Sequence, residues 1–179
     1  MRTNTSRLVL AALLCALTAV LSQIHIPLPP VPVSLSLLSV HLCGALLTAR
    51  WSAAAMACYV LLGACGVPVF AGFAGGPSVL LGPTGGFLMG YIFCAALESM
   101  LLERLGRSRR ALACAMAAGT AACYACGLAW FMLSTGSGLL RSLALCVLPF
   151  LPGDLLKIVF ASSLAMRLQK SLLPSGLSA

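Results

Sequence analysis

The sequence predicts an all-α integral membrane protein, a bundle of six transmembrane helices with apolar, Pro- and Gly-rich loops on the outward side. The chain is 61% hydrophobic and 8% charged, which leaves too little polar surface to cover a soluble protein of its size. Its apolar segments are long enough to cross a bilayer as helices. They show no polar and apolar alternation, which argues against a membrane-spanning β-barrel.

Six segments are expected to span the membrane, and together they form one predicted domain over residues 1–179. The first resembles the core of a signal peptide but leads into Gln23 and His25, so it is expected to be retained as a helix. The second and third are short and meet at Arg50 without a loop, so each is expected to tilt or to cross only part of the bilayer. The predicted spans are residues 8–24, 33–48, 51–66, 79–102, 111–133 and 152–168.

The positive charges predict the orientation. Assigning the loops to alternate sides places nine lysines and arginines on one side and only Arg141 on the other, with Lys157 left inside the sixth span. Because cytoplasmic loops are enriched in these residues, we expect a multi-pass protein of the bacterial cytoplasmic (inner) membrane with both termini cytoplasmic. Topology thus accounts for the net charge of +8, which predicts contact with membrane lipids and not with nucleic acid. The nine residues are Arg2, Arg7, Arg50, Arg104, Arg107, Arg109, Arg110, Arg167 and Lys170.

The three outward connections, residues 26–32, 67–86 and 134–151, are apolar, nearly uncharged and rich in proline or glycine. Since loops in water are usually polar, we expect these to fold over the bundle as a lid above a cavity; ordinary interfacial loops are the alternative. The glycine-rich connection lacks the G-x-x-x-x-G-K-[ST] pattern, so no ATP site is predicted. Its glycines permit close approach of either a ligand or another helix, and the sequence leaves both open.

The segment from Pro149 to Lys157 sets an acid and a base inside an apolar stretch. Ionisable groups at membrane depth are costly and often functional. If a helix begins near Pro152, Asp154 lies in its first turn, where the partial positive charge of the helix end favours the ionised carboxylate, and Lys157 lies above the same face. Two interpretations follow: the two residues bind a small polar ligand, or they form a purely structural pair.

No cofactor, metal site or catalytic centre is predicted. The sequence shows no Ser/His/Asp set, no H-E-x-x-H motif and no second carboxylate at an obvious depth. His25 and His41 look isolated and are expected to be core or interfacial residues. The nine cysteines lie mostly in apolar stretches and are expected to be free thiols, and the lone pair Cys123 and Cys126 is interpreted as small packing residues.

Four motifs give the chain a resemblance to a known family. They are residues 26–33, 63–70, 81–86 and 149–157, of which the Leu-Gly-Pro-Thr-Gly-Gly and Pro-Gly-Asp-Leu-Leu-Lys motifs, in that order, are the most specific. With these motifs nearly the whole chain resembles the BioY family, the biotin-specific substrate-binding membrane subunits (S components) of energy-coupling factor (ECF) transporters.

The resemblance implies a six-helix subunit, not an enzyme, that binds biotin from outside and associates with a transmembrane coupling subunit and two ATP-hydrolysing subunits. It implies that Asp154 and Lys157 contact biotin, with further contacts from Thr84, Gly85 and the aromatic residue that follows. An S component or lone carrier for another small vitamin is the nearest alternative. A small membrane enzyme acting on lipids is a more distant one.

Phe87 stands where the family commonly has tyrosine, so one phenolic hydrogen bond is either absent or supplied by Tyr91. In the first span, Ala12 and Ala16 form a small-x-x-x-small pair that suits close approach of another helix. Internal packing explains such a pair as readily as a partner does. The resemblance implies that this face docks on the coupling subunit.

Overall fold

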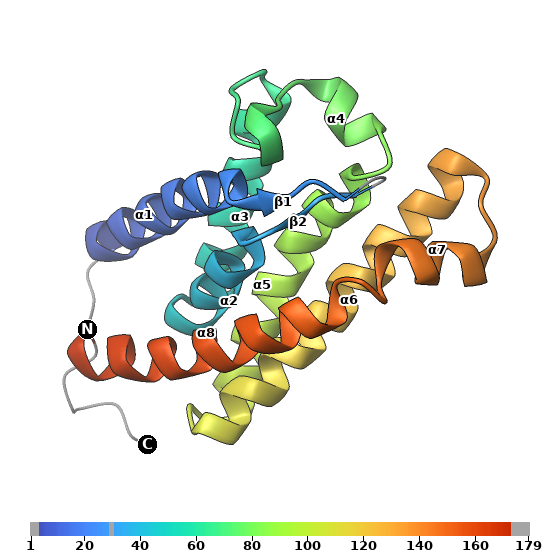
Figure 1. The fold of residues 1–179 in the computed structure, drawn as a ribbon. Coiled ribbons are helices and arrows are strands. Elements are labelled where there is room, and N and C mark those ends of the chain that lie inside the picture. The colour runs from blue at the N-terminus through green and yellow to red at the C-terminus, as the bar shows by residue number, and fades with distance from the viewer. Residues whose placement is uncertain (1–3, 29–30, 173–179) are drawn as a thin grey trace.

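The computed structural model describes residues 4–28 and 31–172, and most of these residues are helical (Figure 1). Arg2, Pro29 and Pro30, which the sequence analysis used, lie outside the described residues. A short antiparallel hairpin, β1 (His25–Ile26) and β2 (Val33–Ser34), follows the first helix. The longer helices are α1 (Asn4–Gln23), α2 (Ser36–Leu46), α3 (Ala49–Ala64), α5 (Gly85–Leu105), α6 (Arg109–Thr135) and α8 (Leu151–Leu172).

Short helices fill two of the predicted outward connections. The 3-10 turn η1 (Ala71–Phe73) and helix α4 (Pro77–Leu81) lie between α3 and α5, and α7 (Leu139–Cys146) lies between α6 and α8. The hairpin, α4 and α7 gather toward one end of the bundle, whereas the turn between α5 and α6 lies at the other (Figure 1). The three connections that were predicted to face outward therefore lie toward the same end of the bundle.

The expected count of six membrane-spanning helices is not confirmed. In the described part of the chain, α1, α5 and α6 are each long and apolar enough to cross a membrane, and α7 with α8 forms a fourth candidate bent by 53°. Helix α2 has 11 residues, about 16 Å at 1.5 Å per residue, whereas the hydrocarbon core is about 30 Å thick. The structure thus supports three or four spanning candidates.

Two predicted boundaries are wrong for identifiable reasons. The second span was expected to begin at Val33, but Val33 pairs with Ile26 in the hairpin, and the helix starts at Ser36. The fourth span was expected to run unbroken from Val79, but α4 ends at Leu81 and α5 starts at Gly85. The intervening Gly-Pro-Thr segment interrupts the helix because proline lacks an N–H and restricts the residue before it.

Helix α5 is the centre of the bundle, packed against α2, α3 and α6. Its approach to α6 depends on glycine: a Cβ on Gly90 would lie 3.0 Å from the carbonyl oxygen of Cys123. Helix α8 packs against both α2 and α6. This arrangement brings the start of α8 beside the middle of α6 and the start of α2, where the candidate site lies.

Candidate functional site

A cavity of about 270 Å³ lies among the start of α2, the first half of α5, the middle of α6 and the start of α8. Residues of all three connections that were predicted to face outward contribute to its wall, as expected if these connections fold over the bundle. The loop residues are Val31 and Pro32 from the first, Phe70, Ala71, Ala74, Val79 and Thr84 from the second, and Phe150 from the third. The volume is near the lower end of the range for small-molecule sites, about 300 to 1,000 Å³.

Asp154 and Lys157 both line this cavity and contact each other. Lys157 Nζ donates to Asp154 Oδ1 at 2.7 Å, one turn along α8. The other carboxylate oxygen, Oδ2, accepts a hydrogen bond from the hydroxyl of Tyr124 on α6. The two charged residues are only 5% and 7% exposed, so the pair is a concentrated polar feature in a mostly apolar wall.

The start of α8 differs from the sequence expectation in one respect. The N–H of Leu151 donates to Val147 O at 3.1 Å and that of Asp154 to Phe150 O at 2.8 Å. The preceding turn therefore already uses these two donors. Asp154 owes its placement to helix geometry and to its hydrogen bonds with Lys157 and Tyr124, and its own N–H is not free to hold a ligand.

Two other predicted residues, on α5 and just before it, carry hydrogen-bonding groups into the cavity wall. Tyr91 places its hydroxyl 2.6 Å from Ser36 Oγ at the start of α2. Thr84, the residue before α5, donates its hydroxyl to Val79 O at 3.3 Å. Both residues thus lie in the wall with polar groups that are already partnered, which fixes their side-chain positions.

Phe87 and Gly85 differ in their relation to the cavity. Phe87 lines it and packs edge-on against Phe150, with ring centroids 6.3 Å apart. Gly85 is buried against the backbone of Leu80, where a Cβ would collide with the carbonyl group. Gly85 is thus required for the tight turn between α4 and α5, and the residues around it contact the cavity.

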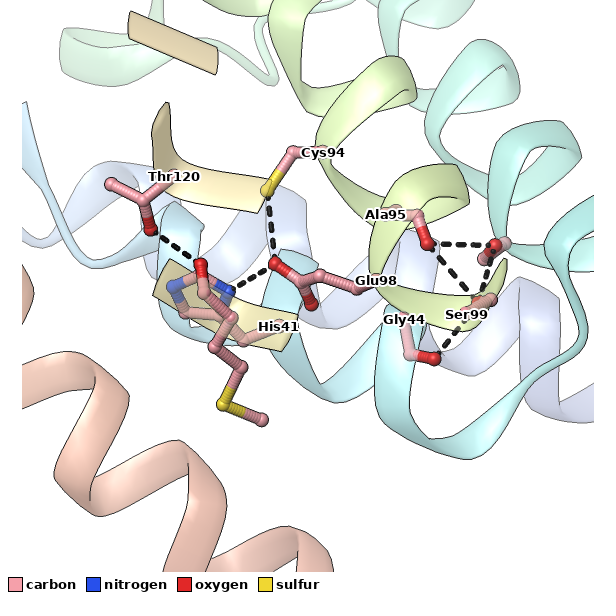
Figure 2. Close-up of polar contacts among 9 residues, drawn as sticks. His41, Gly44, Cys94, Ala95, Glu98, Ser99 and Thr120 are labelled. Carbon is pink, nitrogen blue, oxygen red and sulfur yellow. Dashed lines mark hydrogen bonds and ion pairs between the residues drawn. The ribbon is translucent and has the colours of Figure 1, made fainter. Parts of the chain in front are cut away.

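A second buried acid–base pair contradicts two expectations from the sequence. His41 is not isolated, because its Nδ1 lies 2.6 Å from Glu98 Oε1, and Glu98 is the second carboxylate at depth that the sequence reading missed. Cys94 donates its thiol to the same oxygen at 3.1 Å (Figure 2). All three residues are 0% exposed.

These three side chains are typical metal ligands, and their ligand atoms lie within 4.8 Å of one another. The contact of 2.6 Å between His41 and Glu98 is nevertheless a hydrogen-bond distance. Tetrahedral zinc with bonds of about 2.0 to 2.2 Å would hold nitrogen and oxygen ligands roughly 3.3 Å apart. The arrangement therefore fits hydrogen-bonded packing between α2 and α5.

Comparison with known proteins gives the family. The model of the BioY family matches residues 1–173. The chain belongs to the BioY family. It is 39% identical to the biotin transporter BioY of Thermotoga maritima over 165 residues, which cover 92% of this chain and 96% of that protein. It is 37% identical to the probable biotin transporter BioY of Pyrococcus horikoshii over 161 residues, which cover 89% and 94%.

The fold of this BioY-family chain also matches a solved structure. The match is to the S component for biotin from an ECF-type ABC transporter, with a TM-score of 0.88 and 26% sequence identity, and it covers 95% of both chains. The cavity described above thus belongs to a fold that is shared with that S component for biotin.

The small-residue face of the first helix is unoccupied by the rest of this BioY-family chain. Ala12 and Ala16 are exposed, and Leu8 and Val20, which continue the same row of the helix, are 57% and 62% exposed. Residues four apart lie above one another on a helix. Within the described residues, this face is therefore not used for internal packing, the first of the two interpretations of the Ala12 and Ala16 pair.

Tyr124 and Ser36 are polar residues of the cavity wall that the sequence did not predict. Tyr124 has a signal, a hydroxyl-bearing aromatic in the middle of an apolar span, because such a hydroxyl usually finds a partner when buried. The sequence does not reveal that this partner is Asp154, which lies on another helix. Ser36 carries no comparable signal, since serine is frequent in this chain.

The cysteines of the chain agree with the expectation of free thiols, since all nine are unpaired with one another. Cys123 donates its thiol to Phe87 O at 3.6 Å and is buried at the contact of α6 with α5. Cys126 is partly exposed. Their interpretation as small packing residues fits these positions.

Proposed function

We propose that this chain is the biotin-binding subunit, the S component, of an ECF-type transporter and takes part in biotin uptake. The observation that carries the proposal is the Asp154–Lys157 pair in the wall of a small, mostly apolar cavity. A ligand with a neutral group that offers both hydrogen-bond donors and an acceptor, attached to an apolar body, is complementary to such a wall. Biotin is such a ligand through its ureido ring, and it also carries a carboxylate.

Each part of biotin has a chemical counterpart in the cavity. The ureido N–H groups donate to the Asp154 carboxylate, and the apolar thiolane ring and chain pack against Phe87 and Phe150. Lys157 donates either to the ureido oxygen or to the biotin carboxylate. Thr84 and Tyr91 supply further polar contacts, with Tyr91 in place of the tyrosine that Phe87 replaces. Gly85 contributes through the turn that positions Thr84.

The proposal includes a topology and partners. The chain crosses the cytoplasmic membrane of a bacterium six times with both termini inside, and α2 and α3 cross with help from the hairpin and the loops. A transmembrane coupling subunit docks on the α1 face of Ala12 and Ala16, and two ATPase subunits drive release. In support, that face is exposed and of the shape that favours close helix approach.

Binding of radiolabelled biotin to the purified, detergent-solubilised protein tests the ligand and the site. We expect saturable binding that is weakened about 10- to 150-fold by Asp154→Asn, since a hydrogen bond to a charged group contributes about 1.5–3 kcal/mol. Lys157→Ala should weaken it comparably. Glu103→Gln and Lys170→Ala, which change exposed charges on α5 and α8, are the matched controls and should bind normally.

The outcomes separate the alternatives. A folded wild-type protein that does not bind biotin would overturn the ligand assignment and leave Asp154 and Lys157 as a structural pair. Competition with biotin methyl ester distinguishes the two roles of Lys157: full competition assigns Lys157 to the ureido oxygen, and loss of competition assigns it to the carboxylate.

Co-purification with the coupling module tests the docking face. We expect the double variant Ala12→Leu with Ala16→Leu to lose the partner while retaining biotin binding, because leucine keeps the helices apart. The double variant Ala121→Leu with Ala125→Leu alters an equally small, exposed row on α6 and should keep the partner. Equal loss in both would show that the effect is not specific to α1.

A further inference from the structure

A second hollow runs along the outer side of α8 and shares Lys157 with the ligand cavity. Its volume is about 840 Å³, three times that of the ligand cavity, which is about 270 Å³. One wall is formed by Ile24 and Leu38, and the other by Leu156, Phe160 and Leu164 on α8. We call this hollow the α8 groove.

The α8 groove is open to the outside of the molecule, and its length matches one leaflet of a bilayer. Leu156 and Phe160 in its wall are 62% and 69% exposed, so the chain itself does not cover the groove. From Lys157 to Arg167, the last lining residue, α8 rises by about 15 Å at 1.5 Å per residue. This is half of the hydrocarbon thickness of about 30 Å, which is the depth of a single acyl chain.

The charges at the Arg167 end favour an anion. The sequence contains three acidic residues, and two of them, Asp154 and Glu98, are held in ion pairs with Lys157 and His41. Neither pair includes Arg167, which is exposed. A second guanidinium approaches the same end, because Arg109 Nη2 lies 3.5 Å from Ser163 Oγ, which lines the groove.

We propose that the α8 groove binds one anionic phospholipid, with an acyl chain between Leu38 and Phe160 and the phosphate on Arg167. Arginine suits a phosphate because its planar fork offers two parallel hydrogen bonds. The acyl chain covers the outer side of Lys157 and so helps to keep water from the Asp154–Lys157 pair. The proposal does not depend on which molecule the ligand cavity binds.

Thermal unfolding of the delipidated protein in detergent tests the proposal, with phosphatidylglycerol and phosphatidylcholine of the same acyl chains as probes. We expect phosphatidylglycerol to raise the midpoint more than phosphatidylcholine, and Arg167→Gln to weaken its apparent affinity at least tenfold. Arg110→Gln removes an exposed charge at the start of α6 and should leave the affinity unchanged. Glycerol phosphate, which lacks acyl chains, should have no effect at the same concentration.

Several outcomes would overturn the proposal. Equal responses to the two lipids, or equal losses in Arg167→Gln and Arg110→Gln, would show that no specific phosphate site exists. A response to glycerol phosphate alone would assign Arg167 to a free anion. Leu164→Trp fills the groove and should weaken lipid binding; a lipid-free dimer that this variant abolishes would instead assign the groove to a second copy of the chain. Should Leu164→Trp fail to fold, the arginine variants still decide.

Discussion

Two buried acid–base pairs lie in this bundle, and their surroundings differ. Lys157 and Asp154 are one turn apart on a single helix and line the ligand cavity, where they are 7% and 5% exposed. His41 and Glu98 join two helices, α2 and α5, and are 0% exposed. The pair on α8, the cavity pair, can exchange its contacts for those of a ligand. The pair between α2 and α5, the sealed pair, lines neither the ligand cavity nor the α8 groove.

Glycine shows how tightly the sealed pair is enclosed. A Cβ on Gly44 of α2 would lie 2.6 Å from Glu98 Oε2, and a Cβ on Gly119 of α6 would also collide with this carboxyl group. Two polar atoms of the described side chains, His41 Nε2 and Glu98 Oε2, are buried without a hydrogen-bond partner, and both belong to this pair. The comparison teaches that burial and charge alone do not mark a binding site; an adjoining cavity must be present too.

The largest contrast is expected when each pair is replaced by apolar residues of similar size. Asp154→Leu with Lys157→Met should abolish biotin binding, because it removes every charged group of the cavity wall, but leave the protein folded. His41→Leu with Glu98→Met should retain binding. Its free energy of unfolding should lie within about 2 kcal/mol of the wild-type value, since replacing a buried ion pair by apolar residues is often neutral or stabilising. Biotin binding and denaturant unfolding in micelles measure both. Retained binding in the first variant would remove the distinction between the pairs.

Truncating one member of the sealed pair is the next largest change. Glu98→Ala leaves His41 buried without its partner and should destabilise the protein by about 3–5 kcal/mol. The dissociation constant for biotin, measured where the variant is still folded, should be nearly unchanged. Glu103→Ala, an exposed position on the same helix, is the control and should have little effect. A stable variant that has lost biotin binding would give the sealed pair a role in the site.

The sequence predicted the cavity pair because both of its members lie within one short motif. Asp154 and Lys157 are three positions apart, so helix geometry alone brings them together. The sealed pair joins residues that are 57 positions apart, and no local pattern relates His41 to Glu98. For the same reason the link from Tyr124 to Asp154 was missed.

The sequence likewise predicted part of the fold, namely the long helices, but not the short elements between them. Hydropathy located the long helices α1, α5 and α6, because an apolar run of that length has few other solutions in a membrane. It failed where apolar residues also suit strands and turns. Val33 pairs with Ile26 in the hairpin, and Val79 lies in the short helix α4, which ends before the Gly-Pro-Thr segment. Both interruptions are local, but hydropathy alone detects neither of them.

Each acid also accepts a second hydrogen bond, and the donor to the cavity pair should matter for binding. Tyr124→Phe removes the hydroxyl that donates to Asp154 Oδ2 without creating space. We expect biotin to bind about tenfold more weakly, since a hydrogen bond to a charged group contributes at least about 1.5 kcal/mol. The unfolding free energy should change less. Tyr59→Phe is a control with the same chemistry, because its hydroxyl donates to Val69 O and not to Asp154; an equal loss there would place the effect in the cavity wall generally.

The donor to the sealed pair is weaker and should affect only stability. Cys94→Ala removes a thiol that donates to Glu98 Oε1 at 3.1 Å and leaves a void of about one sulfur atom. Because a thiol is a weak donor and the void is small, we expect a loss of about 1 kcal/mol in unfolding free energy, with unchanged biotin affinity. Cys123→Ala removes a buried thiol at the cavity instead and serves as the matched control. If Cys94→Ala weakened biotin binding as much as Tyr124→Phe, the sealed pair would communicate with the cavity, and the division between a binding pair and a packing pair would fail.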